Sequence, residues 1–260
     1  MNNNLVLESN SFDNNNLDLL INGKILALIV RDYYCSDLCV NIANKILSAG
    51  YEYYSNAPSI GKIGLAYFET ENHPAKIQKY YDSATDNINF FRKICFPFLS
   101  PIDKLRLELE EIWTAGANIE HFHNQKMFVG LCRVIDPNVD FLIHQDIAGR
   151  DAPNSYNALS LISQLSANIY LQVATSGGEL NIWNKELEEE KYGQMRGDIY
   201  GIRREYFGEP DIVIKPNLGD LILFNSRKLH AVAPSNECSR LTISCFIGNR
   251  GKYMPLTYWS

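Results

Sequence analysis

The spacing of apolar residues changes along the chain, and the first half favours helices. Leu38, Ile42 and Ile46 lie on one face of a predicted helix that ends at the next glycine. Two further helices are predicted over residues 75–95 and 102–115, with prolines between them. These helices, together with a turn upstream, predict a supporting layer rather than a site.

The N-terminal region predicts a flexible segment followed by a turn. Residues 1–16 are rich in Asn, a composition typical of disorder. Asn22 and Gly23 lie between two apolar runs, which is the strongest short signal for a type I′ hairpin. We therefore expect residues 17–118 to supply a hairpin and helical support.

From residue 126 onward the pattern is that of β-strands. Short runs of β-branched and aromatic residues alternate with Gly, Pro and Asn. The runs are KMFVGLCRVI, DFLIHQD, SANIYLQVA, GELNIW, DIVIKP, DLILFN and RLTISCFIG. The sequence predicts one domain, mainly β with N-terminal helices, whose β-sandwich or barrel core spans residues 119–260.

Composition and charge narrow the classes of function. The 260 residues carry a net charge of −6, which argues against a nucleic-acid partner. The six cysteines are scattered without a CxxC pair, so we expect reduced thiols in the cytoplasm. No secretory signal is visible, and polar residues interrupt the apolar stretch 17–30, so no membrane association is expected. A monomer and a homodimer are both open.

The first candidate for chemistry is the pair His144 and Asp146, at the end of the run FLIHQD. Residues i and i+2 of a strand share a face, so both side chains can point into the mouth of a barrel. Taken alone, the pair is as well explained by a polar strand end, because so short a pattern often occurs by chance.

Later elements add to this pair. His230 follows His144 by 86 residues, and Arg240 follows His230 by 10 at the start of another strand. A turn at Gly177 and Gly178 leads into a strand between the two histidines. In this order and spacing, residues 126–250 resemble the Fe(II)/2-oxoglutarate-dependent oxygenases, whose fold is a double-stranded β-helix, or jelly roll.

The resemblance assigns a role to each residue. His144, Asp146 and His230 are the catalytic metal ligands, and two imidazoles and one carboxylate on one face of Fe(II) leave three positions open. The cosubstrate 2-oxoglutarate takes two of them and dioxygen the third. Arg240 supplies the planar, permanently charged fork for the distal carboxylate of 2-oxoglutarate. Decarboxylation of the cosubstrate to succinate then drives oxidation of a C–H bond.

Two other polar segments remain open. His121 and His123 also alternate on one face, but only His230 is left to complete a rival metal site, since His73 lies in a predicted loop. The loop GRDAPNSYNAL, which begins at residue 149, suits a lid over the site. It equally suits a surface loop held by an Arg150–Asp151 pair.

Within the superfamily, a softer resemblance points to hydroxylases and radical halogenases of free amino acids, including lysine. It rests on FFRKICFPFLSPIDKLR, HQDIAGRDAP, SGGELNIWNK and the C-terminal aromatic residue Trp259. In the halogenases a small residue replaces the acidic ligand and leaves room for chloride. Asp146 fills that position here, so the resemblance implies a hydroxylase of a basic amino acid such as L-lysine.

The same resemblance suggests substrate-binding residues. Thr242 and Trp259 would line the substrate pocket, and Glu120, Asp151 and Arg92 would meet the charged ends of an amino acid. Each also has a structural explanation; Trp259 can cap a core edge, for example. Two other functions stay open: oxidation of a peptidyl substrate, which an open groove would favour, and a non-catalytic jelly roll.

Overall fold

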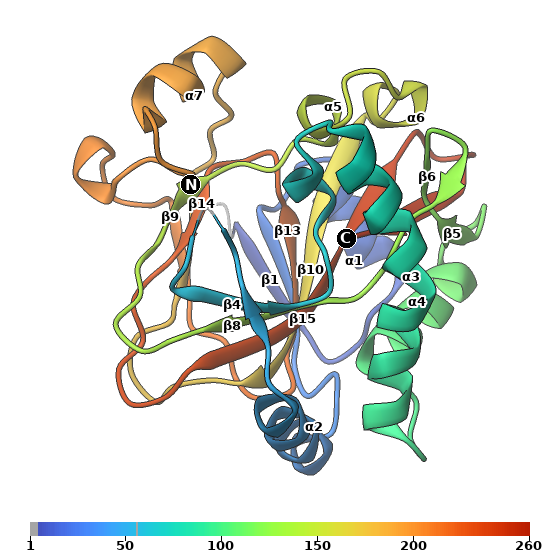
Figure 1. Ribbon diagram of the computed structural model, residues 1–260, viewed down its shortest axis with the longest axis vertical. Coiled ribbons are helices and arrows are strands. Elements are labelled where there is room, and N and C mark those ends of the chain that lie inside the picture. Colours follow the sequence, from blue (N-terminus) through green and yellow to red (C-terminus); the bar gives the residue numbers. More distant parts are fainter. Residues whose placement is uncertain (1–4, 56) are drawn as a thin grey trace.

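The structure is a computed structural model that describes residues 5–55 and 57–260, and its centre is a pair of facing β-sheets (Figure 1). In the larger sheet the strand order is β1 (Val6–Ser9), β2 (Ala27–Val30), β13 (Leu221–Asn225), β10 (Ser163–Gln172), β15 (Arg240–Asn249), β8 (Leu131–Ile135), β4 (Ile60–Ile63) and β3 (Glu52–Tyr53). Off this path, β16 (Leu256–Trp259) pairs with the C-terminal part of β15 and with β5 (Ala117–Ile119).

The smaller sheet closes over one face of the larger one. Its order is β12 (Ile212–Ile214), β11 (Leu180–Ile182), β14 (His230–Val232) and β9 (Phe141–His144). Ile222 and Phe224 of β13 pack against Leu180 and Ile182 of β11 in one buried cluster. These two facing sheets confirm the predicted jelly-roll core.

Helices cover the other face of the larger sheet (Figure 1). Leu241, Ile243 and Cys245 of β15 point toward that helical layer, while Arg240 and Thr242 point between the sheets, because side chains alternate along a strand. The helices of this layer are α1 (Asn14–Ile21), α2 (Ser36–Ala49), α3 (Pro74–Cys95) and α4 (Pro101–Ile112). One face of β15 therefore packs in the hydrophobic core, and its other face lines the space between the two sheets.

The remaining elements are short. The helical ones are η1 (Tyr67–Thr70), α5 (Ala148–Asp151), α6 (Tyr156–Leu159), α7 (Glu189–Arg196) and η2 (Arg204–Tyr206). A separate hairpin joins β6 (His121–Phe122) and β7 (Gln125–Lys126). In residues 5–55 and 57–260 no helix combines the length and the apolar character needed to cross a membrane.

Helical spacing predicted three of the helices correctly. Ile42 and Ile46 of α2 are buried, and the helix ends at Gly50, whose φ of 83° suits glycine. The helices predicted over 75–95 and 102–115 are α3 and α4, the second of which begins at a Ser100 N-cap. Each of the seven predicted strand runs contains a strand of the structure.

The predictions for the N-terminal region are wrong. Asn22 and Gly23 end α1 instead of turning a hairpin, because Leu17 and Leu20 bury a helical face and Gly23 takes the positive φ of a helix end. Of the segment expected to be flexible, residues 6–9 form β1, which pairs in parallel with β2; residues 1–4 lie outside the described part.

The expected division at residue 119 is also wrong. The strands β1, β2 and β4 come from the first 118 residues, yet they extend the same sheet as β10 and β15. Backbone pairing decides this, because β2 lies antiparallel to β13, nearly 200 positions later in the chain. The N-terminal region is therefore part of the core sheet as well as its helical cover.

Candidate active site

Three side chains with metal-binding atoms meet at one end of the smaller sheet. His144 ends β9, Asp146 follows it by two residues, and His230 begins β14. One ligand atom from each lies within 4.8 Å of the others. Within residues 5–55 and 57–260, this is the only cluster of three or more His, Cys, Asp or Glu side chains arranged to hold an ion.

Both imidazole rings are oriented by their own strands. The Nδ1–H of His144 donates to the carbonyl of Leu142 at 2.8 Å, and that of His230 donates to Lys228 at 2.8 Å. A carbonyl can only accept, so each neutral ring keeps its proton on Nδ1 and presents the lone pair of Nε2. Hydrogen bonds of this kind fix the tautomer of metal-binding histidines.

The electrostatics keep His144 and Asp146 in the form that binds a metal. Burial, reinforced by the charge of His230, lowers the pKa of His144 to about 4, so its ring is neutral at pH 7. Burial alone would raise the pKa of Asp146, but contact with His230 and nearby positive charges hold it at about 2. A neutral imidazole and an ionised carboxylate are the forms of these side chains that bind Fe(II).

An inner chamber between the two sheets contains a buried arginine that has N–H groups without hydrogen-bond partners among the described residues. Arg240 is 6% exposed, and its Nε and Nη1 have no hydrogen-bond partner in the described structure. Its Nη2 donates to the Tyr170 hydroxyl at 3.4 Å. The chamber is lined by Arg240 together with His144, Asp146 and His230. A buried guanidinium with free N–H groups fits the distal carboxylate of 2-oxoglutarate.

An outer cavity of about 440 Å³ opens on the same metal-binding cluster. Arg133, Phe141, His144 and Asp146 line both this cavity and the inner chamber. Asp151 of α5 also lines the cavity, and no described residue forms a hydrogen bond or an ion pair with its carboxylate. Burial and the charge of Asp146 raise the pKa of Asp151 to about 8. The cavity thus holds an acidic group without a cationic partner.

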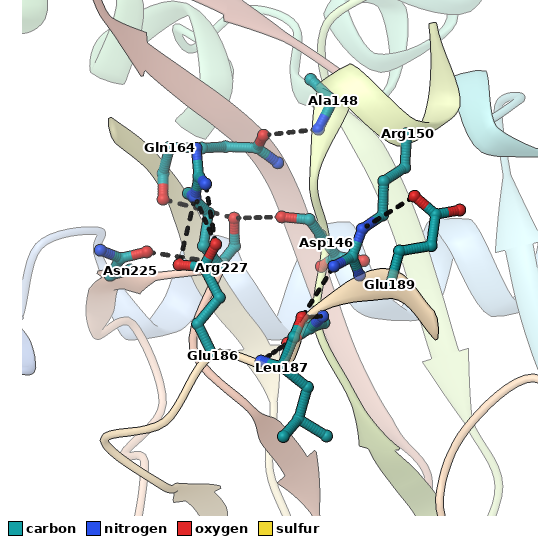
Figure 2. A network of polar contacts seen from close by, with 11 residues as sticks. Asp146, Ala148, Arg150, Gln164, Glu186, Leu187, Glu189, Asn225 and Arg227 are labelled. Atoms are coloured by element: carbon teal, nitrogen blue, oxygen red, sulfur yellow. Dashed lines mark hydrogen bonds and ion pairs between the residues drawn. The ribbon is translucent and has the colours of Figure 1, made fainter. Parts of the chain in front are cut away.

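The helix α7 forms part of the cavity wall and is held by the segment that carries the ligands (Figure 2). The Gln145 side chain exchanges two hydrogen bonds with the Leu187 backbone, at 2.7 and 2.9 Å. Arg150 donates to the same Leu187 carbonyl at 2.8 Å and lies 3.6 Å from Glu189. No residue of α7 is fully buried, and Tyr192 and Met195 add partly buried contacts with the apolar cluster that contains Ile143.

Three of the substrate residues suggested by resemblance do not line either chamber. Glu120 accepts from Arg250 and Thr257 at 2.6 Å each, and Arg92 pairs with Asp103 between α3 and α4. Trp259 is 2% exposed and packs in the core. The structure contradicts these three suggestions, because Glu120 and Arg92 pair with other charged residues and Trp259 packs against Phe122 and Phe246.

Thr242 and Asp151 do lie near the metal-binding cluster. Thr242 lines the inner chamber beside Arg240, so the structure puts it next to the proposed cosubstrate position instead of the outer cavity. Asp151 lines the outer cavity as the resemblance suggested. Only Asp151 of the five suggested residues therefore lies where a substrate would enter.

Two rival interpretations are also resolved by contacts. His123 Nε2 lies 3.0 Å from the Tyr67 hydroxyl, and His121 and His123 belong to no metal-binding cluster among the described residues. The Arg150–Asp151 pair, one of the two interpretations left open for this loop, does not form, since Arg150 contacts Leu187 and Glu189. Residues 152–160 line no part of the outer cavity, whereas α7 does.

Sequence reasoning missed Arg133, Tyr54 and Tyr192, which all line the outer cavity. Arg133 could have been found from the sequence, because a charged residue within the apolar strand LCRVI is unusual unless it has a partner or a ligand. Tyr54 and Tyr192 carried no such signal, since neither stands in a motif. Their positions depend on how β3 and α7 fold back onto the site.

Comparison with known proteins adds a family and several relatives. The family model described as carrier-protein-independent halogenase WelO5 matches residues 4–260. Leucinostatins biosynthesis cluster protein S of Purpureocillium lilacinum is 27% identical over 79% of this chain and 85% of its own length. The crystal structure of an N-substituted L-amino acid dioxygenase from Burkholderia ambifaria with alpha-KG has a TM-score of 0.61, with 17% identity over 94% of this chain and 90% of that one.

Two bacterial enzymes match about half of the chain and about half of their own length. The L-gamma-glutamyl-L-propargylglycine hydroxylase of Streptantibioticus cattleyicolor is 27% identical over 56% of this chain and 55% of that enzyme. The L-isoleucine 3(1)-dioxygenase of Pantoea ananatis is 28% identical over 51% and 47%.

The comparisons confirm the superfamily that the motif order predicted, and with it Fe(II) and 2-oxoglutarate as cofactor and cosubstrate. The predicted oxygenase is confirmed over the alternative of a non-catalytic jelly roll, because the relatives whose names give an activity are oxygenases. The chain therefore belongs to the carrier-protein-independent halogenase WelO5 family, within the Fe(II)/2-oxoglutarate-dependent oxygenases.

Proposed function

We propose that this enzyme hydroxylates an unactivated C–H bond of a free amino acid, using His144, Asp146 and His230 to hold Fe(II) and Arg240 to hold 2-oxoglutarate. With both bound and dioxygen present, the cofactor supplies the oxidant that removes a substrate hydrogen and returns a hydroxyl. The residues of the chain then decide which substrate approaches and which group is transferred.

Asp146 is the observation that carries the choice of hydroxylation over halogenation. The carboxylate stands with His144 and His230 in one cluster and is ionised at pH 7. As a ligand it would occupy the position that a halide requires. Its negative charge would also repel an anion a few ångströms away in a poorly solvated site. The ligand set therefore favours hydroxyl transfer in a family whose description is a halogenase.

The outer cavity supports a small substrate. Its volume of about 440 Å³ falls in the range of small-molecule sites, and α7 forms one of its walls. The carboxylate of Asp151 faces this space without a partner, which favours a ligand that brings an ammonium group. By their names, one of the two bacterial relatives acts on a free amino acid, L-isoleucine, and the other on a γ-glutamyl dipeptide, so the first supports this choice.

A basic amino acid such as L-lysine is the first candidate within this class. Glu69, Glu71 and Glu189 join Asp151 in lining the cavity, and acidic side chains favour a cationic ligand. Glu69, Glu71 and Glu189 already pair with Lys62, Lys76 and Arg150, so the preference rests on Asp151. A basic amino acid carries two ammonium groups that could meet Asp151, and an aliphatic amino acid carries one.

The test is product analysis on the whole protein. The enzyme is loaded with Fe(II) and 2-oxoglutarate and offered each free amino acid in high chloride, while succinate and product masses are measured. We expect one added oxygen on a basic amino acid and no chlorinated product. A chlorinated main product would overturn hydroxylation. Turnover of a peptide, with none of any free amino acid, would replace the substrate class.

The state of the cysteines supports the cytoplasm as the compartment. All six are free thiols, and Cys39, Cys95, Cys132 and Cys245 are buried. Free thiols are typical of reducing compartments. Fe(II) is also maintained more readily where the surroundings are reducing, so the compartment and the proposed cofactor agree.

A further inference from the structure

One arginine between the two sheets has no carboxylate to balance its charge. Lys62, Arg133 and Thr242 lie opposite one another on the neighbouring strands β4, β8 and β15, so their side chains share the inner face of the larger sheet. Lys62 forms an ion pair with Glu69. In the described part of the chain, no Asp or Glu lies within ion-pair distance of Arg133.

The contacts of Arg133 leave most of its donors available. Its Nη1 donates to the Ser244 hydroxyl at 2.7 Å, and no other hydrogen bond of the guanidinium is formed with a described residue. A guanidinium has five N–H donors in a planar fork that matches a carboxylate. Ser244 therefore orients the fork, and the remaining donors are free for a ligand.

The position of Arg133 puts these donors between the two chambers. It lines the outer cavity with Asp151 and the inner chamber with Arg240. Arg240 is the arginine proposed for the distal end of 2-oxoglutarate. A second anion at the junction would therefore belong either to the metal-side end of the cosubstrate or to the substrate.

A second unsatisfied donor lies in the same region. Tyr54 is 4% exposed, and its hydroxyl has no hydrogen-bond partner in the described structure. Tyr54 lines the outer cavity together with Arg133. A buried hydroxyl without a partner costs free energy, so it indicates a group that arrives with a ligand. Although burial raises the pKa of Tyr54, the positive charge of Arg133 lowers it, so the hydroxyl and the guanidinium lie side by side at this junction.

We propose that Arg133, assisted by the Tyr54 hydroxyl, is a carboxylate-binding residue at the junction of the two chambers. The carboxylate comes from one of two sources, the metal-side end of 2-oxoglutarate or the α-carboxylate of an amino-acid substrate. The second source rests on the proposed function, and the first does not. In the second case, Arg133 would bind the carboxylate of a zwitterionic substrate, and Asp151 on the cavity wall would bind its ammonium group.

The cosubstrate arm measures binding without turnover. Anaerobic protein with Fe(II) is titrated with 2-oxoglutarate, and the visible absorption of the chelate gives Kd. If the carboxylate is that of 2-oxoglutarate, Arg133→Gln weakens binding by on the order of 100-fold, as for loss of one partner of a buried charge pair. Tyr54→Phe weakens the same Kd by about tenfold, and Arg133→Lys restores part of the loss.

The substrate arm compares an amino acid with its decarboxylated amine, such as L-lysine with cadaverine. If the carboxylate is that of the substrate, the unmodified enzyme prefers the amino acid in kcat/KM by on the order of 100-fold. Arg133→Gln removes this preference while 2-oxoglutarate binding is unchanged. Thermal unfolding of each variant establishes that it is folded.

A matched control is Arg227→Gln. Arg227 has a carboxylate partner, Glu186, at 2.7 Å and lines neither chamber. Its substitution should change neither measurement. If Arg133→Gln is folded and alters neither the 2-oxoglutarate Kd nor the preference for the amino acid, the inference is overturned. If the unmodified enzyme turns over no amino acid, the proposed function fails, whatever the result for Arg133. In that case the role of Arg133 is tested by cosubstrate binding alone, and an unchanged 2-oxoglutarate Kd in Arg133→Gln overturns it.

Discussion

His144 and His230 are direct cross-strand partners in the antiparallel pair β9 and β14, with ring centroids 4.1 Å apart. Cross-strand partners share a face of the sheet, and Asp146 joins them because it follows His144 by two residues. The backbone of the smaller sheet therefore fixes the distance between the proposed ligands before any ion binds.

Removal of one of these ligands should abolish metal binding. Loss of outer contacts to a metal ligand typically lowers affinity 10–100-fold, so we expect His230→Ala to lower Fe(II) affinity by more than about 100-fold. Calorimetry with Fe(II) or Co(II) under anaerobic conditions measures this. His123→Ala is the control, because His123 contacts Tyr67 and should leave the affinity unchanged.

Arg240→Ala should separate cosubstrate binding from metal binding. The side chain is buried with two free N–H groups and lies in the inner chamber. We expect the 2-oxoglutarate KM to rise by on the order of 100-fold, while Fe(II) affinity stays within about twofold. An unchanged KM would refute the role of Arg240.

Asp151 should make the metal-free protein less stable as the pH rises. Its folded pKa of about 8 lies above the ordinary value of 3.8, so the folded state binds more protons than the unfolded state between these values. Stability is then lost as the pH rises through this window. We expect Asp151→Asn to raise Tm at pH 8.5 by a few degrees and to leave it nearly unchanged at pH 4.

Asp103→Asn should change stability in the opposite direction to Asp151→Asn. Although burial opposes it, bonds from Arg92 and Ser100 and the charge of Arg106 lower the pKa of Asp103 below 3.8. Its contribution to the stability of the folded protein is therefore present above pH 3.8 and is lost as the pH falls through the folded pKa. We expect this variant to lose about 1–3 kcal/mol at pH 7. Stabilisation of both variants at pH 8.5 would contradict the assignment.

The attachment of α7 should depend on contacts from the ligand-bearing segment (Figure 2). Arg150→Ala removes a hydrogen bond to Leu187 and the charge beside Glu189. Each lost bond is worth about 1 kcal/mol, so amide exchange over residues 187–196 should accelerate by about tenfold. Hydrogen–deuterium exchange measures this, with the exposed Glu190→Gln as control. Equal exchange in both variants would show that other contacts hold the helix.

The sequence by itself determined how two of the proposed metal ligands are arranged and much of the fold class. His144 and Asp146 share a face because a strand has a period of two, and this follows from local geometry without any distant contact. The helices α2, α3 and α4 follow equally from spacing and from proline and glycine boundaries. Helix ends and strand periods are properties of short segments, so a single sequence carries them.

Only the tertiary structure decided which charged and aromatic residues face the cavity. Glu120 pairs with Arg250, 130 positions away, and Arg92 pairs with Asp103, so neither side chain faces the cavity. Arg133 gained a role because its strand lies between β4 and β15, neither of which is its neighbour in sequence. An ion pair requires both partners within about 4 Å, and the folded path of the whole chain sets that distance.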